Sequence, residues 1–227
     1  MSKAIAVIEL AIAAGIRSII VDSIAEIERI AASCAALDRP ANLALRLVPS
    51  VMGGTVPGFE TGHGGSKFGM LISELDAAAR LLGKHARLRF RGFHFHVGSQ
   101  VTRASAFAEA LRVVLQAAVA FHERTKLAPE AINMGGGFPI PLVPDREVPL
   151  HRDGAHLAPE IERLLLGELD LAEAAAAARA VWDETAGAVF PRASTQVFIE
   201  PGRRVVGDAG VLLSRIENRK TRPGIQP

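Results

Sequence analysis

Apolar residues recur along this chain in two alternating patterns. Stripes of apolar side chains at helical spacing predict helices with one buried face. Short β-branched or leucine-rich runs without polar alternation predict strands that are covered on both faces. The expected helices cover residues 4–14, 24–34, 71–83, 104–124 and 159–186. The expected strands cover residues 16–21, 43–48, 87–97, 132–134, 197–200 and 211–216.

Polar and glycine-rich residues mark the boundaries between these elements. Ser23 is expected to cap the second helix, with Glu26 completing a capping box. Residues 52–67 are rich in glycine and are typical of a long loop, and residues 139–157, with four prolines, are expected to be irregular. Because strand and helix alternate throughout, the pattern predicts right-handed βαβ units on a parallel sheet, an α/β fold.

Composition narrows the class of protein. The 227 residues are 49% hydrophobic, and 26 basic against 24 acidic residues give a net charge of +2. A substantial core is therefore expected, and a nucleic-acid partner is not, because no basic face is concentrated anywhere. Cys34 is the one cysteine, which excludes a disulfide framework and predicts a buried apolar position.

The sequence gives no sign of a membrane partner. No apolar stretch approaches the roughly 20 residues of a membrane span. The first residues also lack the charged head, long apolar centre and small-residue cleavage site of a signal peptide. We therefore expect a cytoplasmic protein.

The candidate chemistry centres on three consecutive glycines, Gly135, Gly136 and Gly137, which follow the short apolar run 132–134. Glycine gains no packing and loses the most backbone entropy, so stability alone would not favour such a run. Peptides without a Cβ can close their N–H groups around an anion such as a phosphate. Taken alone, the run is also compatible with a simple tight turn.

Two further segments, 93–100 and 198–204, share the same plan of an apolar strand, then glycine, then polar groups. Ligands gather at the carboxyl ends of parallel strands, so the three segments are expected to form one site. Residues two apart on a strand point to the same side, which places His94 and His96 together. Such a pair can ligate a metal or can be hydrogen-bonded in the core, and no further ligand stands at a clear strand end. We expect no metal.

Four motifs, taken in order, resemble a known family: Ser66-Lys67-Phe68-Gly69, His96-Val97-Gly98-Ser99, Gly135-Gly136-Gly137-Phe138 and Glu200-Pro201-Gly202-Arg203. They are similar to the barrel domain of the pyridoxal 5′-phosphate (PLP) decarboxylases that act on diaminopimelate, ornithine and arginine, the group that shares the alanine-racemase-type barrel. The resemblance covers nearly the whole chain. It implies a parallel (β/α)8 TIM-type barrel, here incomplete with about five βα units. It also implies a PLP-binding domain over residues 1–207 and the start of a C-terminal β domain over residues 208–227.

The resemblance implies roles for particular residues. Ser99, the three glycines and the pair Gly202 and Arg203 would hold the phosphate, with Arg203 also available to a substrate carboxylate. His96 would stack on the pyridine ring. Glu200 would pair with the ring nitrogen and keep it protonated, so that the ring accepts the electrons left when carbon dioxide departs. Arg46 and Lys67 are supporting residues. The implied cofactor-binding set is therefore His96, Ser99, Gly135, Gly136, Gly137, Glu200, Gly202 and Arg203, of which His96 and Glu200 are the catalytic candidates.

The chain also departs from this family. The family's lysine that forms a Schiff base with PLP lies in an aromatic-Ala-Val-Lys-Ala motif on the first barrel strand. None of the five lysines here stands in such a motif, and the chain contains no tyrosine, which the family's second domain supplies. About five strands are expected where barrel closure takes eight. We therefore expect a piece of a longer enzyme that lacks about three leading βα units and the C-terminal domain.

Three interpretations follow from these observations. The first is a PLP-dependent decarboxylase of a basic or diamino acid, with diaminopimelate converted to lysine as the favoured reaction and ornithine, lysine and arginine as open alternatives; this chain alone is expected to be inactive. The second is a catalytically inactive PLP-barrel homologue that binds the cofactor or a partner enzyme. The third is a metal-dependent barrel hydrolase that uses His94 and His96. The expected partners are a small amino-acid substrate and either a second copy, in a homodimer, or a complement that supplies the missing segment.

Overall fold

The protein is described by a computed structural model that covers most of the chain. The described residues are 3–51, 67–142, 151–152, 155–156, 165–191, 193–207, 209–210, 213–215 and 217. The expected loop 52–67 therefore lies outside the described residues except for its last residue. The expected strand 211–216 also falls largely outside them, and its described part, 213–215, is not in a strand.

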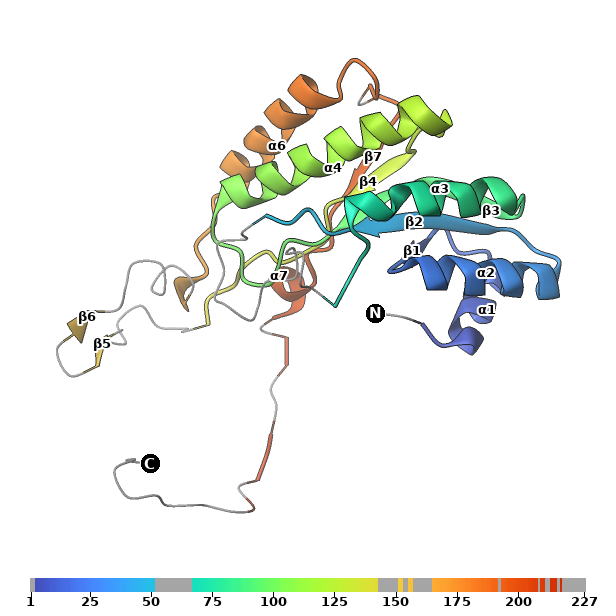
Figure 1. Ribbon diagram of the computed structural model, residues 1–227. Helices are drawn as coiled ribbons and strands as arrows, with labels where there is room; N and C mark the ends of the chain where they lie inside the picture. The colour runs from blue at the N-terminus through green and yellow to red at the C-terminus, as the bar shows by residue number, and fades with distance from the viewer. Residues whose placement is uncertain are drawn as a thin grey trace.

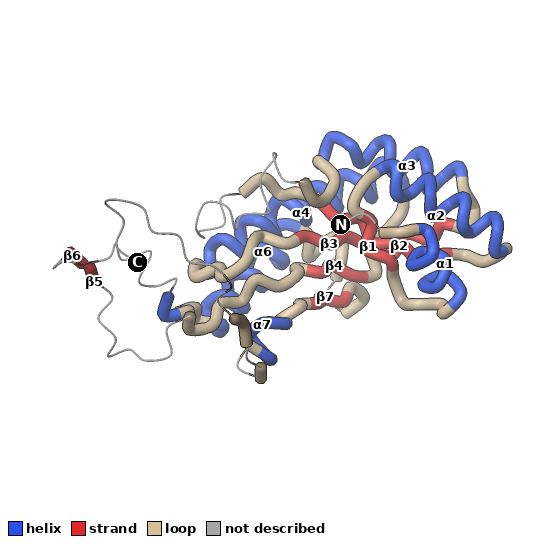
Figure 2. Tube along the Cα trace, turned by 90° about the horizontal axis from the view of Figure 1, so that it is seen from below, coloured by secondary structure: helices blue, strands red, loops and turns tan. Residues whose placement is uncertain are grey.

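Five parallel strands form the central sheet, in the order β1-β2-β3-β4-β7 (Figures 1 and 2). Their bounds are β1 (Ile19–Val21), β2 (Ala41–Leu47), β3 (Leu88–Phe95), β4 (Ala131–Asn133) and β7 (Gln196–Phe198). The predicted α/β fold with a parallel sheet is confirmed, and each of the five expected barrel strands is present.

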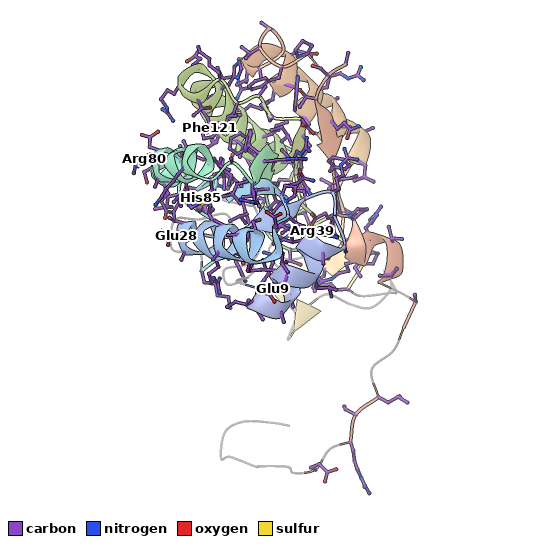
Figure 3. The ribbon with its side chains drawn as sticks, turned by 90° about the vertical axis from the view of Figure 1, so that its right-hand side faces the viewer. Glu9, Glu28, Arg39, Arg80, His85 and Phe121 are labelled. Atoms are coloured by element: carbon purple, nitrogen blue, oxygen red, sulfur yellow. The ribbon has the colours of Figure 1, made fainter. Side chains whose placement is uncertain are left out.

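Helices lie before, between and after these strands, and the longer ones cover one face of the sheet (Figure 1). They are α1 (Ile5–Ala13), α2 (Ile24–Leu37), the 3-10 turn η1 (Ile72–Glu74) leading into α3 (Leu75–Lys84), α4 (Ala104–Thr125), α6 (Leu171–Thr185) and the short α7 (Gly202–Val206). Charged residues such as Glu28 and Arg80 lie on the outer surfaces of α2 and α3 (Figure 3), whereas Phe121 of α4 is fully buried. A two-stranded antiparallel hairpin, β5 (His151–Arg152) with β6 (Ala155–His156), lies away from the sheet (Figure 1).

The two faces of the sheet differ in polarity. Along β2 the burial alternates, with Leu43 and Leu45 fully buried under the helices and Asn42 and Ala44 half-buried on the opposite face. That second face lines a cavity of about 450 Å³. The expectation that both faces are covered is therefore wrong for β2. The β2 run looks continuously apolar in the sequence, but small and polar residues occupy every second position. These residues face the interior of the curved sheet.

The sheet is curled strongly enough for a side chain just before its first strand, β1, to reach its last strand, β7. The guanidinium of Arg17, which precedes β1, lies 4.8 Å from the centroid of the Phe198 ring on β7 and also donates a hydrogen bond to the Gln196 side chain. Because β1 and β7 are the end strands of the five-stranded sheet, this contact spans the interior of the curve. The architecture is that of a partial TIM-type barrel.

The predicted single helix over 159–186 is wrong in its described part. Gly167 has a φ of +63°, and helix α6 begins only after Asp170, whose carboxylate accepts hydrogen bonds from the N–H groups of Ala172 and Glu173 at 2.8 and 3.0 Å. A Cβ on Gly167 would overlap the backbone of Ile140, so a contact distant in sequence places the break. Residues 157–164 lie outside the described part of the chain.

The capping box predicted at the start of α2 is half confirmed. The Ser23 hydroxyl accepts a hydrogen bond from the Glu26 N–H at 3.3 Å. The fully buried Glu26 carboxylate does not reach back to the Ser23 N–H. It accepts instead from the N–H groups of Asp22 and Lys3, at 2.9 and 2.8 Å, and lies 3.2 Å from the Lys3 Nζ. Glu26 therefore ties the residues before α1 to the carboxyl end of β1.

Helix α4 corrects the expectation that no segment could span a membrane. Its 22 residues are long and apolar enough to do so by length and composition. The helix is nevertheless a core element, because 61% of its apolar window is buried in the fold, and it packs closely against α6 (Figure 1). Its apolar character is accounted for by burial on two sides. Cys34 on α2 is buried as predicted.

Candidate functional site

Three strand ends meet in one small pocket at the carboxyl edge of the sheet. The pocket, of about 220 Å³, is lined by residues that follow β3, β4 and β7: His96, Ser99, Gly136, Gly137, Phe138, Glu200, Pro201, Gly202 and Arg203. Seven of the eight residues predicted from the sequence are in this lining. The eighth, Gly135, is buried beside it, and its carbonyl accepts a hydrogen bond from the Glu200 N–H at 2.8 Å. The structure thus brings the predicted site residues together.

The triple glycine is required by contacts between neighbouring strand ends. Gly135 and Gly137 have φ values of +69° and +98°, which other residues rarely adopt. A Cβ on Gly135 would overlap the carbonyl oxygen of Phe95, and a Cβ on Gly137 would overlap that of Gly98. A Cβ on Gly136 would likewise overlap the Glu200 carbonyl oxygen. The glycine run therefore lets the segments that follow β3, β4 and β7 approach closely. This packing is a second reason for glycine here, in addition to access for an anion.

Two of the three glycine N–H groups already have protein acceptors. The Gly135 N–H donates to Asn133 Oδ1 at 2.9 Å, and the Gly136 N–H donates to His96 Nδ1 at 3.1 Å. Within the described part of the chain, the Gly137 N–H has no such acceptor. Gly137 is therefore the member of the run whose N–H is best placed to bind an anion.

His96 and His94 extend from the end of β3 to the same side, as their spacing predicted. His94 is buried, and its Nε2 lies 3.7 Å from Glu200 Oε1. The pKa of His96 is lowered from its ordinary value, chiefly by burial, then by the charges of Arg46 and His94, with Glu200 acting in the opposite direction. A lowered pKa agrees with the hydrogen bond that Nδ1 accepts from Gly136, because only the neutral ring offers an acceptor there.

Glu200 is held as a carboxylate. Its pKa is lowered to about 2 by interaction with His94, by the hydrogen bond from Asn133 and by the charges of His94 and His96, while burial acts against ionisation. The 3.7 Å separation from His94 is long for a hydrogen bond, whereas the Asn133 Nδ2 donates to Oε1 at 2.8 Å. Asn133 therefore makes the shorter of the two contacts with the carboxylate.

Arg46 supports the site from β2, as the sequence suggested. Its guanidinium lies 3.3 Å from the Asp22 carboxylate and 5.0 Å from the centroid of the Phe68 ring. Burial lowers the pKa of Arg46, and the nearby carboxylates of Asp22 and Glu200 raise it. Lys67, the other supporting candidate, lies 5.2 Å from the centroid of the same Phe68 ring. It is not among the residues that line the pocket.

Two polar residues at this edge were missed from the sequence. Asn133 is the last residue of β4 and bonds both the glycine run and Glu200, and Asp22 follows β1 and fixes Arg46. Asn133 stands at the very end of its strand, and Asp22 is the first residue after its strand. A polar residue at a strand end is therefore the sequence feature that could have identified both, once the strand ends are known.

The structure gives no support to a metal site at the histidine pair. Among the residues described, no group of three or more histidine, cysteine, aspartate or glutamate side chains is arranged to hold a metal ion. His96 Nδ1 is engaged by the Gly136 N–H, and His94 faces Glu200.

The fold and the site define an α/β barrel-type protein with a polar, glycine-lined pocket at the carboxyl ends of its strands, a place suited to a small anionic cofactor. The chain belongs to the family described as "Pyridoxal-dependent decarboxylase, pyridoxal binding domain", whose model matches residues 1–207. The cofactor of this family is PLP, as the motif resemblance implied.

Curated relatives and solved structures agree with this family. The diaminopimelate decarboxylase of Halalkalibacterium halodurans is 30% identical over 99% of this chain and 47% of its own length. That of Methanocaldococcus jannaschii is 31% identical over 93% of this chain and 43% of its own. The chain spans about half the length of the curated relatives it matches.

Two crystal structures show the same fold. Diaminopimelate decarboxylase from M. jannaschii superposes with a TM-score of 0.68 at 28% identity, over 97% of this chain and 46% of that one. A mutant Helicobacter pylori diaminopimelate decarboxylase complexed with L-lysine gives a TM-score of 0.68 at 22% identity, over 89% of this chain and 44% of that one. The second likeness concerns the fold alone.

Proposed function

We propose that this chain binds PLP in the pocket at the ends of β3, β4 and β7 and contributes that half-site to an amino-acid decarboxylase, with diaminopimelate as the substrate. One observation supports this proposal above the others. An ionised carboxylate, a neutral imidazole, a glycine run and an arginine line the same pocket of about 220 Å³. These groups match the ring nitrogen, the ring face and the phosphate of one small molecule.

The phosphate end is assigned to Ser99, Gly137, Gly202 and Arg203. The Ser99 hydroxyl and the Gly137 N–H are hydrogen-bond donors, and the Arg203 guanidinium supplies positive charge. All four residues line the pocket. The close approach of the Gly137 peptide to Gly98, which a Cβ would prevent, shapes this end of the pocket. The residues present thus fit a phosphate monoester.

The ring end is assigned to Glu200 and His96. When bound, PLP supplies a pyridinium ring that takes up the electrons released as carbon dioxide leaves the substrate. Glu200, with its pKa of about 2, remains a carboxylate and can accept a hydrogen bond from a protonated ring nitrogen. Neutral His96, positioned through Nδ1 by the Gly136 N–H, presents an uncharged aromatic ring to its face.

The choice of substrate rests on relatives. The similar curated proteins named above are diaminopimelate decarboxylases, which favours diaminopimelate over ornithine, lysine or arginine. We assign the PLP-binding domain to residues 1–207 and the start of a C-terminal β domain to residues 208–227. A second copy in a homodimer, or a segment that complements the half-site, would complete the enzyme.

Covalent capture of the cofactor needs a lysine that the chain does not place in this pocket within its described residues. Lys3 donates from Nζ to the Ile20 carbonyl at 2.6 Å and pairs with Glu26. We infer that the described residues hold PLP through noncovalent contacts. An inactive homologue would bind PLP in the same way, so binding and turnover must be tested separately.

Binding of pyridoxamine 5′-phosphate, which lacks the reactive aldehyde, tests the pocket. Its dissociation constant should be at least about tenfold lower than that of pyridoxamine, because the phosphate gains charge-assisted hydrogen bonds. Arg203→Gln should remove most of that preference, and Arg112→Gln should not, because Arg112 pairs with Glu184 on the outer helices. Equal affinity for the two ligands would contradict the assignment.

A further inference from the structure

Asn133 lies between the glycine run and Glu200 and touches both. Its Oδ1 accepts a hydrogen bond from the Gly135 N–H at 2.9 Å, and its Nδ2 donates to Glu200 Oε1 at 2.8 Å. No other side chain in the described part of the chain is shown bonding both of these groups. The residue is the last of β4, the strand between β3 and β7.

The orientation of this amide is fixed by its partners. A peptide N–H can only donate, so it requires the oxygen of Asn133, and an ionised carboxylate can only accept, so it requires the nitrogen. Aspartate at this position would keep the acceptor for Gly135 but would place a second carboxylate against Glu200. Alanine would remove both contacts. Asparagine is therefore the side chain that satisfies the two neighbours at once.

We propose that Asn133 is a positioning residue that couples the glycine run to Glu200 and holds the Glu200 carboxylate ionised and aimed into the pocket. The proposal deepens, and rests on, the assignment of Glu200 to the ring nitrogen of PLP. Asn133 is not itself among the pocket-lining residues, so it acts through Glu200 and Gly135.

The groups around Glu200 make this role specific. His94 from β3 lies 3.7 Å from the carboxylate, His96 lines the same pocket, and the positive charge of Arg46 on β2 interacts with Glu200. All of these groups favour an ionised Glu200. Asn133 adds a direct hydrogen bond to the Glu200 carboxylate. Replacing its amide nitrogen by an oxygen, as in Asn133→Asp, would turn this attraction into repulsion between two carboxylates.

The first test measures the Glu200 carboxyl without any cofactor. In the full 227-residue chain carrying 13C-labelled glutamate, the Glu200 side-chain resonance is followed against pH for the wild type, Asn133→Asp and Asn133→Ala. Asn133→Asp should raise the apparent pKa of Glu200 by more than about one unit, because two carboxylates then share one site. Asn133→Ala should raise it less, because it removes a donor without adding a charge.

Asn42→Asp is the matched control. Asn42 faces the same side of the sheet from β2, and its Oδ1 accepts from Arg91 Nε at 3.0 Å, so an aspartate there pairs with Arg91 and leaves Glu200 unchanged. Asn133→Asp keeps the acceptor for Gly135 and should fold, which separates the electrostatic effect from loss of structure. A Glu200 pKa equal to the wild-type value in Asn133→Asp would overturn the role of Asn133.

The second test measures affinity for pyridoxamine 5′-phosphate at neutral pH. Asn133→Asp should weaken binding about tenfold or more, and Asn42→Asp should bind as the wild type does. The two proposals fail separately. Absence of binding by the wild type would overturn the assigned function, and equal binding by the wild type and Asn133→Asp would overturn the positioning role.

Discussion

His96 shows how a hydrogen bond and a pKa constrain each other at the scale of one residue. Its Nδ1 accepts from the Gly136 N–H, and its pKa is lowered from 6.5, chiefly by burial. A folded-state pKa below the unfolded one means that the neutral ring stabilises the fold. This contribution is complete above pH 6.5 and is lost as the pH falls through the lower, folded-state pKa.

We therefore predict that His96→Asn flattens the acid side of the stability profile. Asparagine can offer an oxygen to the Gly136 N–H but does not titrate. Chemical denaturation between pH 7 and about pH 5 should show a smaller fall in the free energy of unfolding for His96→Asn than for the wild type. His85→Asn, at the end of α3, should retain the wild-type profile. Identical slopes for His96→Asn and the wild type would refute this account of the ring.

Gly137 gives a second residue-scale prediction. Its φ of +98° and the overlap of any Cβ with the Gly98 carbonyl predict that Gly137→Ala lowers the free energy of unfolding by about 1–3 kcal/mol or more. Gly83→Ala is the control, because Gly83 is in helix α3 and a Cβ there meets no atom within 4 Å. Gly83→Ala should be stabilising by up to about 1 kcal/mol. Thermal unfolding of both variants provides the measurement.

At the scale of elements, α6 depends on its cap. The Asp170 carboxylate accepts from two N–H groups at the start of the helix. Asp170→Ala should cost about 1 kcal/mol of stability, and Asp170→Asn should cost much less, because asparagine also caps well. Guanidinium denaturation compares the two. Equal losses for both variants would mean that charge, and not the hydrogen bonds, stabilises the start of α6.

The elements could be predicted where their cause is local. The apolar stripes of α2 and α4 and the apolar runs of the five strands are sequence properties, and they were placed within a few residues. The break before α6 was missed because it depends on a close contact between the backbones of Gly167 and Ile140, which are distant in the chain. The register shift between β2 and β3, where Leu43 pairs with Phe90 and Ala44 with Gly92, was also missed.

The site could be predicted because parallel strands end at one edge. Motifs that follow strands far apart in sequence, such as His96 and Glu200, therefore converge in one pocket. The role of Asn133 could not be predicted in this way. Its two contacts become visible only when the distance from its amide to Glu200 is known. The occupied N–H groups of Gly135 and Gly136 were missed for the same reason.

At the scale of the whole molecule, the five strands form an open, curled sheet. Arg17, just before β1, reaches Phe198 on β7, the cavity inside measures about 450 Å³, and apolar residues such as Leu10 on α1 and Ile199 after β7 are exposed by 69% and 54%. Edges of this kind are sites for further strands or subunits. The arrangement agrees with a chain that spans about half of its relatives.

We predict that the purified 227-residue chain, supplied with PLP, releases carbon dioxide from diaminopimelate at a rate near background. The pocket holds no lysine in its described lining, and substrate positioning requires groups beyond this half-site. A full-length diaminopimelate decarboxylase assayed in parallel is the positive control. Rapid turnover by the isolated chain would show that its own residues complete the active site.

The central claim is that one pocket holds the PLP phosphate while Glu200 meets the ring nitrogen. It is tested most directly by the 15N chemical shift of the ring nitrogen in labelled pyridoxamine 5′-phosphate bound to the chain. We expect a protonated nitrogen in the wild type at neutral pH and loss of that protonation in Glu200→Gln. A ring nitrogen with the same shift in both proteins would contradict the account.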